Sequence, residues 1–413
     1  MASLAKRAVP FLGIALLSAL MASRISSTGD WPVDSWPAIH SLTQGNLGDY
    51  LGVKAMMGPF STLLQAPFAA MGGGDQMAAY QLASFPCLFA AGLLGLYLAA
   101  IARRRGVALP GQILIAGLCV ANPLSVEALQ AGHPEEILTS ALAVGAIAAA
   151  ADGKRGGAAV LLGLAIASKQ WAVIAILPAL MALPGARLRT GIVALGVVVA
   201  FTLPAFVASP ETFTEVQDNA ANTGRVVGPW SIWYPTASVR SEVVAEEPEV
   251  LTAHVHVAPP LVGALSHPLI VFLAVVVPLG LAWRRGGFRL DAGEAMALLA
   301  LLALLRCALD PVDNVYYHAP LLLALIGWDA FSARGLPLRG LLGVAVALGF
   351  REWSLHLEDV SAYNRAYIAA ILVAGAAITA SLMRVPDRKL TFGWMKPKFR
   401  GSRNSGDGRL KAL

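Results

Sequence analysis

The sequence predicts an all-α polytopic membrane protein with about 10 to 12 transmembrane helices and a long first extracytoplasmic loop. Of the 413 residues, 57% are hydrophobic and only 14% are charged, whereas roughly a quarter of the residues in a soluble protein are charged. Apolar runs that approach the length of a membrane crossing recur along the chain. Lys and Arg residues are concentrated in every second connection between these runs, as the positive-inside rule requires.

The runs are bounded by charged residues or by Gly and Pro. They lie at residues 8–23, 82–102, 111–130, 136–151, 157–168, 171–184, 190–208, 264–283, 292–309, 316–332, 339–355 and 365–384. With both termini in the cytoplasm, 23 of the 31 Lys and Arg residues fall inside and 19 of the 25 Asp and Glu residues fall outside. Acidic residues contribute little to orientation, so their excess outside indicates chemistry at the outer surface.

The first run, 8–23, is predicted to be an uncleaved anchor, because the residues that follow it make a poor cleavage site. Runs 157–168 and 171–184 are too short to cross alone, and they flank Lys169. Either they form a broken hairpin with Lys169 at its tip, or one helix end stops below the outer surface and opens a cavity. Both arrangements place an ammonium group in apolar surroundings.

We expect one transmembrane domain over residues 1–390, with long outer loops at 24–81 and 209–260. An apolar stretch at 59–71 is predicted to lie along the interface as a helix, and neither loop shows strand-like alternation. Residues 391–413 are predicted to be a basic, disordered cytoplasmic tail near anionic lipid. A nucleic-acid role is not favoured, because nothing folded accompanies these charges. The three cysteines lie in apolar runs and are interpreted as packing residues.

Charged residues gather at the outer ends of several runs. Asp30 and Asp34 lie four apart between tryptophans, a pattern that also suits an ordinary interfacial loop. His133, Glu135 and Glu136 stand at the mouth of a hairpin, where helix capping would explain one or two of the acids but not the histidine. No second His or Cys stands at helical spacing, so no metal ligand is assigned there.

The remaining clusters lie near Lys169 and after residue 305. Lys169 precedes Trp171, and an intramembrane cation is functional unless it reaches the headgroups. Arg306 and Asp310 are spaced to form an ion pair with each other. Tyr316, Tyr317 and His318 follow them, and residues 351–365 are expected to pair among themselves on a solvated loop. Together these groups suit a ligand with sugar hydroxyls, a phosphate and a lipid tail.

Two stretches carry a family resemblance. Ala131-Gly-His-Pro-Glu-Glu-Ile-Leu138 and Gly163-Leu-Ala-Ile-Ala-Ser-Lys-Gln-Trp171, in this order, resemble the middle of the polyprenyl-phosphate-sugar-dependent GT-C membrane glycosyltransferases, in particular glycosyltransferase family 87. The resemblance implies a mannosyltransferase-like hexosyl- or pentosyltransferase of the plasma (inner) membrane. Its donor would be a polyprenyl-phosphate sugar, its acceptor a glycan or glycolipid, and its active site would face outward.

The resemblance also implies roles for individual residues. An acidic residue in the first outer loop would be the general base, either Asp30 or Asp34, with Asp30 favoured. The family pattern has a tyrosine where this chain has Asp34. Lys169 and Arg306 would bind the phosphate of the donor. The sugar would be bound by His133, Glu135, Glu136, Trp171, Asp310, Tyr316, Tyr317 and His318.

No cofactor is assigned, although the acidic groups permit a divalent metal, Mg²⁺ or Mn²⁺. A secondary transporter or flippase for a lipid-linked sugar is the main alternative function. Transporters commonly show repeats between their halves, and the chain has no internal repeat. A non-catalytic scaffold is a third reading that would not need Lys169 and His133 at membrane borders.

Overall fold

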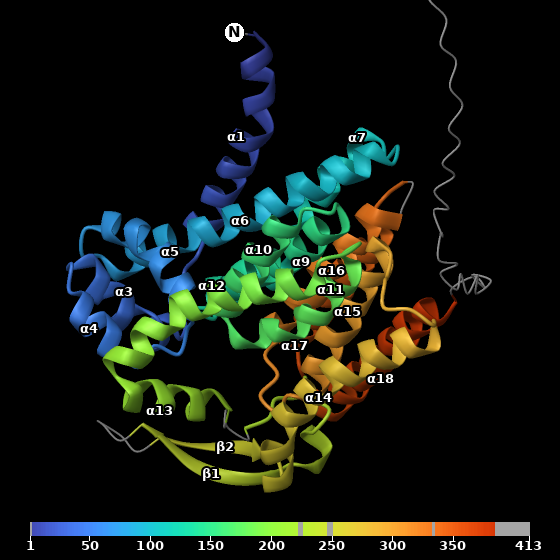
Figure 1. The fold of residues 1–413 in the computed structure, drawn as a ribbon. Coiled ribbons are helices and arrows are strands. Elements are labelled where there is room, and N and C mark those ends of the chain that lie inside the picture. Colours follow the sequence, from blue (N-terminus) through green and yellow to red (C-terminus); the bar gives the residue numbers. More distant parts are fainter. Residues whose placement is uncertain (1, 222–225, 246–250, 333–334, 385–413) are drawn as a thin grey trace, which may run out of the picture.

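The computed structural model describes residues 2–221, 226–245, 251–332 and 335–384, and it confirms an all-α polytopic architecture (Figure 1). The N-terminal helices are α1 (Ala2–Ser23), α2 (Trp31–Asp34), α3 (Trp36–Thr43), α4 (Leu47–Gly52), α5 (Pro59–Ala69), η1 (Ala70–Gly72), α6 (Gln76–Arg104), α7 (Leu109–Leu118) and α8 (Pro123–Gln130). The middle elements are α9 (Pro134–Ala151), α10 (Arg155–Ser168), η2 (Gln170–Ala175), α11 (Ile176–Ala182), α12 (Arg187–Ala208), α13 (Pro210–Ala221), η3 (Tyr234–Thr236), β1 (Ser238–Ala245) and β2 (Leu251–Val257). The C-terminal helices are α14 (Pro260–Arg284), α15 (Ala292–Leu309), η4 (Val315–His318), α16 (Ala319–Ser332), α17 (Leu338–Leu355) and α18 (Val360–Met383).

Each predicted apolar run overlaps one or more helices, but run 111–130 is interrupted at residues 119–122, between α7 and α8. Among the described residues, 7 helices are long and apolar enough to cross a membrane, and the helices at Ala8–Ser23, Arg155–Ser168 and Gln170–Ala182 are apolar but shorter. The count of 10 to 12 crossings remains a prediction. The basic tail predicted at 391–413 lies outside the described residues.

The predicted break at Lys169 is present. Helix α10 ends at Ser168, and Lys169 has an extended backbone with φ −150° and ψ 134° before the chain resumes as the 3₁₀ helix η2. Non-helical backbone at membrane depth is tolerated when it is buried in protein or faces a wet cavity. The interruption therefore identifies a place where the helical bundle is hollow.

Helix α9 is the centre of the bundle. It contacts α6, α10, α11, α15 and α16, and nearly all of its residues are buried. Its sequence after Glu136 is rich in alanine, and small side chains let neighbouring helices approach closely in a membrane protein. The packing fixes both ends of α9, and its first turn carries three of the predicted site residues.

Helices α12 and α14 lie at the outside of the bundle. Few of their residues are buried, and large apolar side chains such as Ile192, Leu203 and Phe272 are exposed. Apolar faces of this length on a polytopic protein suit contact with lipid.

The two outer loops contain regular structure. The first forms α2 to α5, of which α3, α4 and α5 lie together in Figure 1, and α5 confirms the predicted helix. The second forms α13 and an antiparallel hairpin of β1 and β2, in which Ser238 pairs with Val257. The prediction of no strands there was wrong, because Leu251-Thr-Ala-His-Val-His-Val257 alternates between apolar and polar residues and forms β2.

The helix ends predicted to be cytoplasmic lie against one another. Arg104 pairs with Asp152 at 3.1 Å, and Arg285 pairs with Glu294 at 2.8 Å. Arg105 donates a hydrogen bond to the Phe331 carbonyl. These contacts gather the ends of α6, α9, α14, α15 and α16 on one side of the bundle.

Candidate active site

A cavity of about 790 Å³ lies at the other end of α9 and α15. Its polar end contains Asp30, Asp34, His133, Lys169 and Arg306. Its apolar wall includes Ile166 and Ile174 beside the break at Lys169, Val198 and Ala205 of α12, and Ile270 and Val271 of α14. The cavity thus joins a charged chamber to the lipid-facing helices.

Asp30 and Asp34 are held by the short helix α2. Trp31 between them is fully buried, donates its indole N–H to Gln65 Oε1 at 3.3 Å, and packs against Trp36 and Tyr80 at ring distances of 4.9 and 5.0 Å. A buried aromatic ring with a satisfied N–H fixes the helix on which it stands. The carboxylate of Asp30 projects into the open, with a side chain that is 72% exposed.

The loop carrying Asp30 meets the loop carrying His133 backbone to backbone. The Asp30 N–H donates to the Ala131 carbonyl at 3.0 Å. Gly132 has φ +89°, and a Cβ at this position would lie 2.5 Å from the Thr28 oxygen. Only glycine suits a left-handed backbone in such close contact. This junction places the two loops in one fixed arrangement.

His133 joins these carboxylates to α9. Its side chain is buried, with Nδ1 3.0 Å from Glu135 Oε1 and Nε2 3.4 Å from Asp30 Oδ2. The imidazole stacks on Tyr316 with ring centroids 4.9 Å apart. Asp34 lies in the same group, and burial raises its pKa, an effect opposed by the nearby His133.

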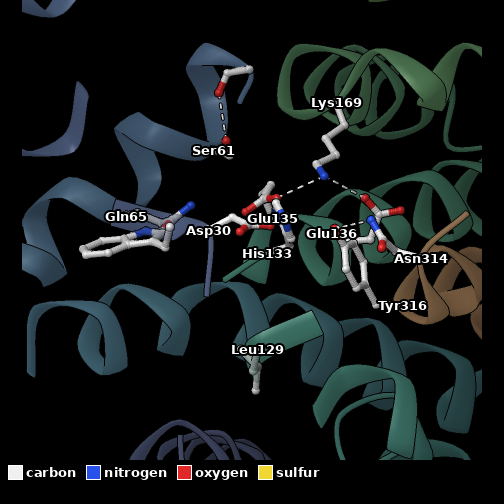
Figure 2. A network of polar contacts seen from close by, with 12 residues as sticks. Asp30, Ser61, Gln65, Leu129, His133, Glu135, Glu136, Lys169, Asn314 and Tyr316 are labelled. Atoms are coloured by element: carbon white, nitrogen blue, oxygen red, sulfur yellow. Dashed lines mark hydrogen bonds and ion pairs between the residues drawn. The ribbon is translucent and has the colours of Figure 1, made fainter. Parts of the chain in front are cut away.

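Glu135 and Glu136 are fully buried in the wall behind the cavity. The Lys169 ammonium lies 3.1 Å from a carboxylate oxygen of each (Figure 2). Glu136 also accepts from Arg306 at 3.0 Å and from the Trp171 indole at 3.1 Å. Buried charges persist when they are paired and hydrogen-bonded, and here two anions meet two cations. These glutamates hold the cations in place rather than line the cavity.

Arg306 is packed between aromatic rings. Its guanidinium carbon lies 4.8 Å from the Trp171 ring centroid and 4.3 Å from that of Tyr317. Such cation–π contacts favour arginine over lysine at this position. The expected pairing of Arg306 with Asp310 is absent from the ion pairs of the described residues, and Asp310 instead lies 3.6 Å from His267 Nε2.

Nine of the twelve predicted site residues line the cavity, Glu135 and Glu136 lie in the wall behind it, and His318 lies apart. Those in the cavity lining are Asp30, Asp34, His133, Lys169, Trp171, Arg306, Asp310, Tyr316 and Tyr317. His318 lies apart, where its Nε2 is 3.0 Å from the Tyr367 hydroxyl. Arg351 was expected to pair with a residue in 351–365, but it pairs with Glu127 at 2.6 Å.

Two residues of the cavity were not predicted. Tyr50 and Thr202 line it, and the Tyr50 hydroxyl lies 3.1 Å from that of Thr62. Tyr50 belongs to the first outer loop, whose internal packing was not predicted. Thr202 is a single polar residue in an apolar helix, a pattern that ordinary helix packing also explains.

A second buried cluster lies behind Arg306. Asp313 Oδ2 accepts from the Tyr367 hydroxyl at 2.6 Å, while Oδ1 has no hydrogen-bond partner among the described residues. Burial raises the pKa of Asp313 well above its usual range. Burial therefore favours the protonated form of this carboxyl group in the folded protein.

The matched family agrees with the predicted resemblance. Residues 52–186 match the family model described as alpha-(1->6)-mannopyranosyltransferase, N-terminal domain. This stretch contains the first turn of α9 and the break at Lys169, whereas Asp30, Asp34 and Arg306 lie outside it. No curated protein sequence matches the chain. The chain is therefore an all-α polytopic membrane protein similar, over residues 52–186, to the alpha-(1->6)-mannopyranosyltransferases, which confirms the expected resemblance to GT-C glycosyltransferases.

Proposed function

We propose that this protein is a membrane mannosyltransferase that transfers a sugar from a polyprenyl phosphate to a glycan or glycolipid acceptor. The reaction inverts the anomeric centre and takes place on the extracytoplasmic face. One observation carries the proposal: a single cavity holds three carboxylates, including Asp30 and Asp34 of the first outer loop, together with two cations and an apolar wall formed by lipid-facing helices.

The carboxylates supply the general base. A base removes the proton from the acceptor hydroxyl as that oxygen attacks the anomeric carbon, and the bond to the phosphate oxygen breaks. Asp30 is the more accessible and lies beside His133, whereas burial raises the pKa of Asp34 and makes it the stronger base. The resemblance favours Asp30, and substitution of each separates the two.

The cations supply leaving-group stabilisation. Lys169 and Arg306 reach the cavity surface, and negative charge develops on the departing phosphate. Both are oriented by Glu136, so their charges are preorganised before the donor binds. Arg306 offers a planar fork that suits a phosphate, and the Tyr317 ring beside it offers a surface for a sugar.

The apolar wall accommodates the isoprenoid. Val198, Ala205 and Ile270 line the cavity from α12 and α14, and the outward faces of these helices are also apolar. A carrier lipid can therefore pass from the bilayer to the polar chamber without crossing charged surface.

The orientation follows from the two ends of α9. His133 stands at its N-terminus in the cavity, and Asp152 follows its C-terminus beside the basic Arg104. Arg and Lys mark the cytoplasmic side, so the cavity faces outward. Cysteine labelling at Asp34 and Arg104 in sealed vesicles tests this arrangement, and labelling of both from the same side contradicts it.

The activity itself is tested with purified protein in detergent and a radiolabelled polyprenyl-phosphate mannose. We expect transfer to a mannoside acceptor from this donor but not from a nucleotide mannose. Asp30→Asn or Asp34→Asn, whichever removes the base, should lower kcat by about 10² to 10⁴-fold. Transfer from the nucleotide sugar alone contradicts the donor assignment. Movement of the donor across sealed vesicles without a new glycosidic bond would instead show a transporter.

A further inference from the structure

Three ligand atoms converge at the polar end of the cavity. One carboxylate oxygen each from Asp30 and Asp34 and one ring nitrogen of His133 lie within 4.8 Å of one another. We propose that these three residues form a binding site for a divalent cation of the Mn²⁺ or Mg²⁺ class. The inference deepens the proposed function and rests on it for the role of the cation in catalysis, but not for its binding.

The orientation of His133 points to a cation. Its Nδ1 lies 3.0 Å from Glu135 Oε1, and a carboxylate only accepts hydrogen bonds, so Nδ1 carries the proton. In the neutral imidazole, Nε2 then presents a lone pair to Asp30 Oδ2 at 3.4 Å. Two acceptors facing each other repel unless a positive charge lies between them. His133 is only 5% exposed, so water does little to relieve this repulsion.

Glu135 and His133 match an arrangement that is common in metal-binding sites. Histidines that bind metals commonly donate their other N–H to a carboxylate, which fixes the ring and strengthens the ligand. Glu135 is fully buried and paired with Lys169 at 3.1 Å, which favours its ionised form as the partner of His133. The order Glu135, His133 and cation thus follows the geometry of known carboxylate–histidine–metal sites.

The spacing and access also fit. Octahedral Mg²⁺ binds oxygen at about 2.1 Å, so adjacent ligands lie about 3 Å apart. The distance from His133 Nε2 to Asp30 Oδ2 is 3.4 Å, and all three ligand atoms lie within 4.8 Å of one another, within reach of a small movement of the exposed Asp30 side chain. Both aspartates line the cavity, which leaves the remaining coordination positions for water or substrate oxygens.

The charges of the chamber require compensation. Lys169 and Arg306 face Glu135 and Glu136 in the wall, and Asp30, Asp34 and Asp310 add three more carboxylates from the lining. Acidic side chains of this chamber and its wall thus outnumber the Lys and Arg side chains by five to two before an anionic phosphate donor enters. A divalent cation between Asp30 and Asp34 offsets that repulsion and lies where the acceptor hydroxyl must be activated.

The ligand types favour Mn²⁺ over Mg²⁺. Carboxylate oxygens suit both ions, whereas an imidazole nitrogen suits transition metals better than Mg²⁺. The competing account is a doubly protonated His133 that donates to both Glu135 and Asp30 and needs no metal. The two accounts make opposite predictions for metal binding.

The test measures Mn²⁺ binding to the full chain in detergent, stripped of metal and without donor or acceptor. Free aqueous Mn²⁺ is followed by its electron paramagnetic resonance signal during a titration. We expect one ion per chain, with affinity at least about 10-fold weaker in His133→Ala and in Asp34→Asn. Asp310→Asn removes a carboxylate from the same cavity outside the cluster, and it should bind Mn²⁺ as the parent does.

The result that overturns the proposal is equal Mn²⁺ binding by the parent, His133→Ala and Asp34→Asn, or no binding by the parent. Asp34 is only partly buried, so its variant remains informative if His133→Ala elutes as aggregate in size-exclusion chromatography. Tight Mn²⁺ binding without sugar transfer would contradict the proposed function alone. Sugar transfer at full rate by metal-free protein that binds no Mn²⁺ would contradict the cation site alone.

Discussion

Arg306 and Glu136 are 170 residues apart in the sequence, and their side chains meet at 3.0 Å in the buried wall of the cavity. The contact joins the last turn of α15 to the first turn of α9. It also orients a cation that the proposed reaction places at the leaving phosphate. The same pair therefore contributes to both folding and catalysis.

Glu136→Ala should strongly destabilise the protein. It leaves Arg306 without its carboxylate and removes one of the two partners of Lys169, and breaking a buried ion pair typically costs about 3 to 5 kcal/mol. Thermal unfolding in detergent measures the change. Arg365→Ala is the control, because the exposed Arg365–Asp359 pair is 4.0 Å long and such pairs contribute about 0 to 1 kcal/mol. Equal stability of the two variants would contradict the structural role of Glu136.

Gly132→Ala should impair catalysis by separating Asp30 from His133. The new methyl group would lie 2.5 Å from the Thr28 oxygen, so the junction between the loops must open. A displacement near 1 Å at a catalytic group can cost about 100-fold in rate. The measurement is kcat/KM for sugar transfer.

Gly153→Ala is the matched control for this substitution. Gly153 also has a positive φ, +73°, but a Cβ there meets nothing within 4 Å. It introduces similar backbone strain far from the cavity. If both alanine variants lose the same fraction of activity, backbone strain rather than the loop junction is responsible.

Ala205→Trp should block the isoprenoid. Ala205 lines the apolar wall, so a large side chain there fills the space assigned to the lipid. We expect KM to rise about 10-fold or more for a long-chain polyprenyl donor and much less for a short-chain analogue. Leu203→Trp, on the same helix but exposed and outside the lining, should change neither value. A loss that ignores chain length would place the lipid elsewhere.

Asp313 should make stability depend on pH. Below pH about 4, the unfolded Asp side chain and the buried one both hold a proton. At higher pH only the folded state keeps it, because burial raises the pKa of Asp313, so this contribution to stability is lost as pH rises toward the folded-state pKa. Relative to the parent, Asp313→Asn should lose less thermal stability between pH 4 and pH 7. Identical pH profiles would show that Asp313 ionises normally.

Much of the fold could be predicted because the signals for it are local. Apolar runs identify helices by composition alone, and a single lysine between two short runs predicted the break after Ser168. The hairpin of β1 and β2 was missed because seven alternating residues carry a weak signal beside long apolar helices. Pairing between distant residues, such as Arg306 and Glu136, has no local signal at all.

The sequence predicted which side chains lie near one another better than it predicted how they are arranged. Charged residues at outer helix ends converge, so Asp30, His133 and Lys169 were expected together, and they line one cavity. Neither the burial of Glu135 behind that cavity nor the separation of His318 from it could be read from spacing, because both depend on how helices rotate against one another. Asp310 was expected to pair with Arg306 because it lies four residues away. Arg306 instead pairs with Glu136, which is 170 residues away in the sequence.

The backbone junction at Gly132 has a mechanical consequence. The loop that carries Asp30 cannot move freely toward an incoming acceptor, because the Asp30 N–H donates a hydrogen bond to the Ala131 carbonyl in the turn before α9. Helix α13 also lines the cavity, and its contacts with the first outer loop and with the break after α10 include the surface pair Lys54–Glu215 and the hydrogen bond from Gln170 to Gln217. We therefore expect a bulky acceptor to be admitted by movement of α13 rather than of the loop that carries Asp30.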